Sequence, residues 1–326
     1  MKILITGASG FIGLNLLECF LGAGHDVWAI AADQIPTLAR DEFSRLPGRF
    51  HEMQADVRDR VAMEKAVRDA APQVIIAAAA ITAGTARELA SPGDILEVNL
   101  VATLRMVELA ARYTVPRVVC FSSTAAMGEL PFLGQPVAET KAPQPITHYG
   151  ISKAAIEASA ERWNAIASGP RVYVARLSAV FGPWERDSGV RDTLSPLHWM
   201  VRQSIAARPI GPLPVGGERD WAYAPYVAEV VQWLATATTP EHIVYNVGPG
   251  AVWHPRLLIA ALAEVGIQIT ESPTAEPIPF NDDVTRRRAP LDASRISAAF
   301  RTPPEPAAAL GRFARWVAGH REWYRA

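Results

Sequence analysis

Cysteine, net charge and long hydrophobic runs are all scarce in this sequence. Only two cysteines, Cys19 and Cys120, occur among 326 residues, and we interpret both as small buried residues of a protein kept in a reducing compartment. No run reaches the roughly 18 apolar residues that a membrane-spanning helix needs. The amino terminus turns to glycine at Gly7, too early for the apolar core of a signal peptide. These absences predict a cytoplasmic protein with no membrane partner.

The charge balance and the histidine positions argue against two further kinds of site. The 32 basic and 33 acidic side chains give a formal net charge of −1, whereas a nucleic-acid-binding surface needs a basic excess. The seven histidines show no metal-ligand spacing, and two isolated cysteines cannot form a thiolate zinc site. We therefore expect no nucleic-acid partner and no metal.

Short apolar runs alternate with amphipathic segments over the first 130 residues. Fully apolar strands that alternate with helices are typical of a parallel sheet covered by helices on both faces. The sequence therefore predicts an α/β fold with a doubly wound parallel sheet of the Rossmann type. The expected strands are 2–6, 27–31, 74–80 and 117–122, and the expected helices are 11–23, 61–70 and 94–113.

A glycine-rich turn joins the first expected strand to the first expected helix. Gly7 permits a tight turn, Gly10 lets the backbone approach a pyrophosphate, and Gly13 allows the helix to pack closely on the strand. The phosphates would sit at the helix amino terminus, where N–H groups and the helix dipole favour negative charge. This turn, with Phe11 and Ile12 in the first helical turn, predicts a dinucleotide-binding site.

The spacing Gly7-x-x-Gly10-x-x-Gly13 resembles the short-chain dehydrogenase/reductase superfamily, and within it the extended branch, the NAD-dependent epimerase/dehydratase family. Segments along nearly the whole chain continue the resemblance in the family's order. One departure is Ala77, where the family often has histidine. The resemblance implies that five residues after the glycine turn also belong to the cofactor site: Asp56, Val57, Ala79, Ala80 and Asn99.

The identity of the nicotinamide cofactor depends on the tip of the second expected strand. An acidic residue there would bind the ribose 2′-hydroxyl and exclude a 2′-phosphate. The family's acidic position falls on Ala31, and Asp33 follows two residues later. No arginine sits at that tip in the sequence to favour NADP. We therefore predict NAD, bound in part by Asp33, with NADP as the alternative; a plain turn residue is the other interpretation of Asp33.

Tyr149 and Lys153 are four residues apart, so both project from one face of a helix. A free tyrosine has a pKa near 10, and a nearby ammonium with the cationic nicotinamide lowers it by stabilising the phenolate. Tyr149 can then exchange a proton with a carbinol oxygen while hydride passes to or from the nicotinamide. The pair resembles the family's Tyr-x-x-x-Lys motif. The resemblance of residues 121–128 places a third catalytic residue, a hydroxyl, on Ser123.

The residues that follow Ser123 limit the reaction type. Family members that dehydrate or decarboxylate sugars place a carboxylate just after this hydroxyl. Here the next residues are Thr124, Ala125 and Ala126. We therefore expect oxidation–reduction or epimerisation without an elimination step.

The resemblance also implies a substrate side in the later half of the chain. Ala179 stands where nucleotide-sugar enzymes usually carry a substrate-binding asparagine, which argues against a nucleotide sugar. Arg219, in an Arg-Asp-aromatic element, suits a phosphate or carboxylate, and a surface ion pair is its alternative interpretation. Thr124 and Arg288 are the remaining candidate substrate residues, although a solvated basic face is the ordinary interpretation of the arginine run at 286–288.

Proline is unevenly distributed, with nine residues before Asn164 and seventeen beyond it. Since proline breaks strands and helices, we assign a regular cofactor domain to residues 1–180 plus about 221–248. A smaller, discontinuous α/β substrate lobe takes about 181–220 plus 249–326. Helices are expected at 226–236 and 255–265.

The leading hypothesis is an NAD(P)-dependent epimerase or oxidoreductase of a small carbohydrate-like substrate. A dehydrogenase or carbonyl reductase of a non-nucleotide sugar acid or aldehyde is the alternative, and a non-catalytic dinucleotide sensor is a third. The resemblance implies a homodimer formed by the helices at 94–113 and 149–167.

Overall fold

The computed structural model describes residues 1–166, 168–192, 194–280 and 283–325. Ala167, the last residue of the expected helix at 149–167, lies outside these ranges. Within them, no helix is long and apolar enough to cross a membrane. Both cysteines are free thiols; Cys120 is buried and Cys19 is partly buried.

A seven-stranded sheet forms the centre of the molecule. Its strand order is β3-β2-β1-β4-β5-β6-β9, and each neighbouring pair is parallel. This order is that of a Rossmann fold, which confirms the predicted fold class. The strands are β1 Lys2–Thr6, β2 Asp26–Ala31, β3 Arg49–Gln54, β4 Val74–Ala77, β5 Arg117–Ser123, β6 Arg171–Leu177, β7 Val180–Phe181, β8 Ala222–Tyr223 and β9 Val244–Val247.

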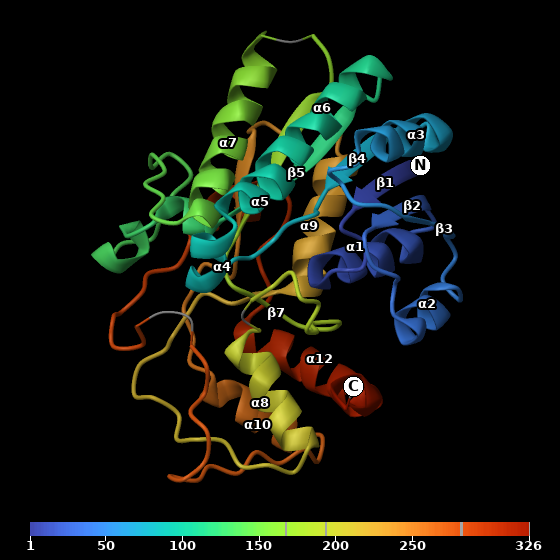
Figure 1. Ribbon diagram of the computed structural model, residues 1–326. Helices are drawn as coiled ribbons and strands as arrows, with labels where there is room; N and C mark the ends of the chain where they lie inside the picture. Colours follow the sequence, from blue (N-terminus) through green and yellow to red (C-terminus); the bar gives the residue numbers. More distant parts are fainter. Residues whose placement is uncertain (167, 193, 281–282, 326) are drawn as a thin grey trace.

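Helices cover both faces of this sheet (Figure 1). Several helices carry an arginine in the last turn, among them Arg40, Arg68 and Arg112, whose cations lie near the negative pole of the helix dipole. The helices are α1 Phe11–Gly22, α2 Thr37–Phe43, α3 Arg60–Ala70, α4 Thr85–Ala90, α5 Pro92–Leu96, α6 Ala102–Arg112, α7 His148–Ile166, α8 Pro196–Ile205, α9 Ala224–Thr236, α10 Arg256–Ala263, α11 Ser294–Ala299 and α12 Pro306–Gly319.

The central strands are largely apolar because they contribute side chains to two hydrophobic cores. Ile3 and Ile5 of β1 join the core that includes α1, α9 and α12. Leu4, between them, joins the core formed with α3 and α6 on the opposite face. Alternate side chains of a strand point to opposite faces, so a central strand covered on both sides has few polar positions. This arrangement explains the continuous apolar runs in the sequence.

The later part of the chain contributes to two regions. α9 packs on α1, and β9 pairs with β6 in the main sheet. The other late helices α8, α10 and α12 gather at the bottom of Figure 1, apart from α3 and α6. β7 and β8 form a separate two-stranded sheet. This distribution supports the proposed discontinuous substrate lobe.

Two differences from the predicted element boundaries bear on the site. β4 ends at Ala77 rather than at residue 80, because the chain turns there into the loop beside the glycine turn. The helix expected over 94–113 begins at Pro92 and is interrupted by a π-helical turn, Glu97–Val101. Such turns are frequent at functional sites, and this one carries Asn99.

Candidate active site

One cavity of about 860 Å³ lies at the carboxyl ends of the strands, the edge at which ligands bind in open α/β sheets. It runs from the glycine turn, past the ends of β4 and β5 and the start of α7, to residues of the later half. The structure brings all but one of the predicted site residues to its lining: Gly7, Gly10, Phe11, Ile12, Gly13, Asp33, Asp56, Val57, Ala79, Ala80, Ser123, Thr124, Tyr149, Lys153, Ala179, Arg219 and Arg288.

Asn99, which the resemblance places in the cofactor site, is the exception, because it does not line the cavity. Its side chain is fully buried, away from the cavity lining. The Asn99 amide oxygen accepts the Ile81 N–H at 2.7 Å, and its amide nitrogen donates to the Ile81 carbonyl at 3.0 Å and to Ser152 Oγ at 3.3 Å. Asn99 therefore fixes the loop that follows β4, and this loop lines the cavity.

The glycine turn fits a pyrophosphate. Gly7 has a φ of +69°, and a Cβ there would lie 2.6 Å from the Cα of Ala79. A Cβ on Gly13 would lie 2.1 Å from the Gly7 carbonyl oxygen, so neither position accommodates a side chain. Helix α1 begins after Gly10 without a side-chain cap, so the N–H groups of its first turn can bind an anion.

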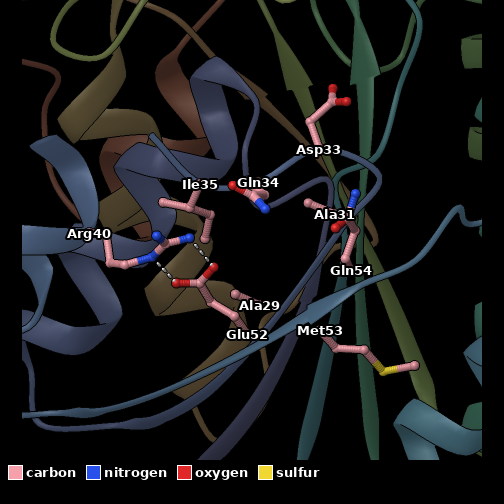
Figure 2. Close-up of a pocket in the computed structure, with 9 residues that line it drawn as sticks. All are labelled: Ala29, Ala31, Asp33, Gln34, Ile35, Arg40, Glu52, Met53 and Gln54. Atoms are coloured by element: carbon pink, nitrogen blue, oxygen red, sulfur yellow. Dashed lines mark hydrogen bonds and ion pairs between the residues drawn. The ribbon is translucent and has the colours of Figure 1, made fainter. Parts of the chain in front are cut away.

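The adenosine end of the cavity carries Asp33, which also lines a second pocket shown in Figure 2. The structure differs from the sequence-based expectation at this point, because Arg40 of α2 reaches that same pocket. Its guanidinium forms a bidentate ion pair with Glu52 of β3, with N–O distances of 2.5 and 2.8 Å. The arginine is near the tip of β2, but a carboxylate compensates its charge.

Asp56 lines the cavity beside Val57, but its carboxylate is engaged within the chain. Arg58 donates to it from both its side chain, at 2.7 Å, and its backbone N–H, at 2.8 Å. These bonds to Arg58 hold the pKa of Asp56 below its usual value. Asp56 is therefore an ionised acceptor in the part of the cavity where the adenine is predicted to bind.

The three predicted catalytic residues lie together. Tyr149 and Lys153 share one face of α7, and the Lys153 Nζ is 5.4 Å from the centroid of the Tyr149 ring. Ser123, at the end of β5, hydrogen-bonds the Tyr149 side chain, and so does Thr82 from the loop after β4. No sequence pattern indicates Thr82, because only the fold brings this loop against α7.

In the protein without cofactor, burial has the largest effect on the pKa values of Tyr149 and Lys153. It raises the pKa of Tyr149, and the Ser123 hydrogen bond and the positive charge of Arg191 offset part of that rise. Burial also lowers the pKa of Lys153 to about 8. The expected low pKa of Tyr149 is therefore not a property of the protein by itself. It requires further positive charge in the cavity, such as the oxidised nicotinamide of the predicted cofactor.

Thr124 is buried, and its hydroxyl donates to the Leu177 carbonyl at 3.1 Å. This bond ties the end of β5 to the end of β6, next to Ala179. A structural role therefore accounts for the Thr124 hydroxyl, although the residue lines the cavity.

The far end of the cavity is rich in arginine. Arg219 is 3% exposed and donates to the carbonyl of Glu218 at 2.7 Å, so it is not a surface ion pair. The Arg288 Nε lies 3.8 Å from the buried carboxylate of Asp220. Arg286 lines the same region and pairs with Glu129. Guanidinium groups in this number suit a phosphate or carboxylate ligand.

Two further arginines of the lining, Arg186 and Arg191, belong to a segment for which no functional role was predicted. Both follow Trp184, a residue that is fully buried. Among the described residues, no group of three or more histidine, cysteine or acidic side chains could hold a metal ion.

Comparison with known proteins identifies the family. A model of the NAD dependent epimerase/dehydratase family matches residues 3–248. The chain belongs to this family. The predicted resemblance is thereby confirmed, and the Rossmann sheet with its Tyr149–Lys153 helix is the framework that members of the NAD-dependent epimerase/dehydratase family share with this chain.

Relatives within this family have several activities. The chain is 29% identical over 194 residues to a probable UDP-glucuronate 4-epimerase of Rhizobium meliloti, covering 57% of this chain and 55% of that protein. It is 27% identical over 262 residues to a probable dTDP-glucose 4,6-dehydratase of Sinorhizobium fredii, covering 76% and 71%. Its fold is similar to that of a UDP-glucose-4-epimerase of Stenotrophomonas maltophila bound to NAD and formylated UDP-arabinopyranose. The TM-score is 0.81 and the sequence identity is 20%, and the match covers 100% of this chain and 98% of that chain. The chain thus spans about half the length of the first of these relatives.

Proposed function

We propose that this chain is an NAD-dependent epimerase of a sugar carried on a nucleoside diphosphate. One observation carries the proposal. A single cavity connects the glycine turn, the Ser123–Tyr149–Lys153 group and the arginines at 219, 286 and 288. A dinucleotide, a reacting sugar and an anionic substrate group can therefore be bound in sequence along it.

The proposed chemistry assigns a task to each catalytic side chain. Bound NAD supplies a hydride acceptor at its nicotinamide ring. Tyr149, as phenolate, takes the proton of the substrate hydroxyl and returns it when the ketone is reduced. The Ser123 hydroxyl, which contacts the Tyr149 side chain, orients the same substrate oxygen. Lys153 stabilises negative charge on Tyr149 from one helical turn away.

The arginine-rich end supports a diphosphate as the anionic group. The oxygens of a diphosphate accept several charge-assisted hydrogen bonds, and guanidinium groups provide them in bidentate geometry. Burial raises the pKa of Asp220, so its negative charge competes less with a bound phosphate for Arg288. The nucleotide-sugar names of the relatives support the same substrate class. These observations favour a nucleotide sugar although Ala179 stands where an asparagine usually binds the substrate, because that replacement removes only one contact.

The two carboxylates that line the substrate end of the cavity, Glu129 and Asp283, do not favour an elimination. Elimination of water needs a protonated acid beside the sugar. The Arg286 hydrogen bond holds the pKa of Glu129 below its usual value, and the Thr285 hydrogen bond does the same for Asp283. Both stay ionised at neutral pH and are poor proton donors. Thr124, Ala125 and Ala126 occupy the positions after Ser123.

A net dehydrogenase or reductase of a non-nucleotide sugar acid is the second candidate, and Ala179 in the cavity lining favours it. Purified protein, NAD and a panel of UDP-glucose, UDP-glucuronate, dTDP-glucose and free sugar acids separate the candidates. An epimerase forms an epimeric nucleotide sugar without net reduced cofactor. Accumulation of reduced cofactor with a free sugar acid supports the second candidate, and a 4-keto-6-deoxy product would overturn both.

We also propose a homodimer in the cytoplasm, with α6 and α7 at the interface. Ile151 and Ile166 of α7 are 44% and 61% exposed, and a partner subunit would remove these apolar side chains from water. Sedimentation of the purified protein at micromolar concentration tests this: a monomer would contradict the proposal.

A further inference from the structure

Residues 185–192 form a strap that joins the glycine turn to the loop after β4. At one end, an Arg186 Nη donates to the Ser9 carbonyl at 3.2 Å. At the other end, the Thr82 N–H donates to the Val190 carbonyl at 2.9 Å, and the Asp192 N–H donates to the Thr82 carbonyl at 3.1 Å. The strap therefore contacts the same loop whose Thr82 side chain bonds Tyr149.

An ion pair fixes the second end of the strap. The Arg87 guanidinium donates to the Asp192 carboxylate at 2.8 Å and to the Gly189 carbonyl at 2.8 Å. The Gly84 N–H donates to the same carboxylate at 2.8 Å. Asp192 thus connects the strap to the start of α4 through two separate groups, and Gly189 adds a third contact.

Between these anchors, the strap places Arg191 in the cavity. Its guanidinium pairs at 2.9 Å with the carboxylate of Glu185, which is 1% exposed. Ser195 holds that carboxylate from its N–H at 2.8 Å and its hydroxyl at 2.6 Å. Arg191 also lies over the ring of Phe11, 5.6 Å from the centroid. Arg191 and Tyr149 line the same cavity.

We propose that Arg191, fixed by Glu185, is a positioning residue that stabilises the Tyr149 phenolate during proton transfer. This inference rests on the proposed role of Tyr149 as acid and base. An arginine suits the task because its guanidinium stays protonated at every pH at which the protein is folded. Burial lowers the pKa of Lys153 to about 8, so the ammonium of the lysine is partly lost in mildly alkaline solution.

The other charged and titratable groups around Tyr149 do not replace Arg191. Glu88 of α4 accepts the Tyr149 backbone N–H at 3.3 Å, and the neighbouring His148 lies 3.8 Å from that carboxylate. A carboxylate opposes ionisation of the phenol. Burial raises the pKa of the Cys120 thiol, near Lys153, to about 12, so it carries no charge at neutral pH. Arg191 acts on Tyr149 in the opposite direction and lowers its pKa.

The test compares Arg191→Met and Arg191→Lys in the NAD-loaded protein. The first readout is the phenolate absorbance of Tyr149, obtained against Tyr149→Phe so that the other tyrosines cancel. The second is the pH profile of kcat/KM for epimerisation. We expect Arg191→Met to raise both midpoints by about one pH unit, with a loss of about tenfold at neutral pH that recovers at high pH. Arg191→Lys should restore most of the difference, and the distant Arg301→Met should change neither.

A wild-type midpoint in both readouts for Arg191→Met overturns the inference. A raised KM with an unmoved pH profile also overturns it, since Arg191 would then only bind substrate. If Tyr149→Phe retains turnover, the proposed function fails instead; the absorbance titration distinguishes the two failures because it needs no turnover.

Discussion

The Tyr149 ring lies 5.4 Å from the Lys153 ammonium nitrogen on one face of α7, in a cavity that also contains Ser123. Removal of the Tyr149 hydroxyl should therefore abolish proton transfer and leave the remaining contacts of the cavity in place. We expect Tyr149→Phe to lose turnover by a factor of about 10² to 10⁴ and to bind NAD as the wild type does. Tyr113→Phe is the matched control, because the Tyr113 hydroxyl bonds Glu64, outside the cavity. Steady-state kinetics measure turnover, and an NAD titration measures cofactor binding. Equal losses of turnover in the two variants would contradict the catalytic role of Tyr149.

Two glycines of α1 provide a direct comparison of cofactor packing. A Cβ on Gly13 would lie 2.1 Å from the Gly7 carbonyl oxygen, whereas a Cβ on Gly22 would have no neighbour within 4 Å. We expect Gly13→Ala to abolish NAD binding and to lower the free energy of unfolding by about 2 kcal/mol or more, as overpacking does. Gly22→Ala should bind NAD normally and change stability by less than about 1 kcal/mol. Calorimetric titration measures NAD binding, and denaturant unfolding measures stability. Normal NAD binding by Gly13→Ala would contradict the proposed role of the turn.

The pocket in Figure 2 predicts how the cofactor preference can be changed. Glu52 compensates the charge of Arg40 at the tip of β2, and the 2′-phosphate of NADP would compete with that carboxylate. Glu52→Gln should therefore strengthen NADP binding by up to about fivefold relative to NAD, the range expected for a partly exposed ion pair. The gain should vanish in the Arg40→Met/Glu52→Gln double variant. Glu64→Gln, which removes a similar pair with Arg112 away from the cavity, is the control; an equal gain there would refute the explanation.

His198 predicts the acid sensitivity of the fold. Burial lowers the pKa of His198 from its ordinary 6.5 to about 4. The unfolded chain therefore binds a proton in the window from pH 6.5 to 4 that the folded protein excludes, and the free energy of unfolding falls as the pH falls through it. The loss is about 3 kcal/mol in total at about 1.4 kcal/mol per pH unit. Urea unfolding at several pH values should show a shallower slope for His198→Phe. His51→Phe, whose side chain is 43% exposed in the wild type, should keep the wild-type slope.

The parts of the structure that depend on local patterns could be predicted from the sequence. The glycine turn, the apolar strands and the four-residue spacing of Tyr149 and Lys153 are local, and each is found where the pattern indicates. Ser123 could also be predicted from its neighbours in the sequence, since it lies at the end of a strand.

The residues that escaped prediction depend on contacts between distant segments. Thr82 reaches Tyr149 only because β4 ends early and Asn99 holds the loop that follows it. Arg40 reaches the tip of β2 because α2 folds back on the sheet, and Arg191 enters the cavity on a strap with no regular secondary structure. Such contacts have no period or spacing in the sequence that could reveal them.

The central claim is that hydride leaves the substrate and returns to the opposite face of the same carbon. UDP-glucose and UDP-glucuronate that carry deuterium at C4 test it most directly, with the products followed by nuclear magnetic resonance and mass spectrometry. The account predicts a C4 epimer that retains the deuterium and incorporates no hydrogen from solvent, in the wild type and not in Tyr149→Phe. Loss of the label to solvent, or an oxidised product formed together with stoichiometric reduced cofactor, would contradict it.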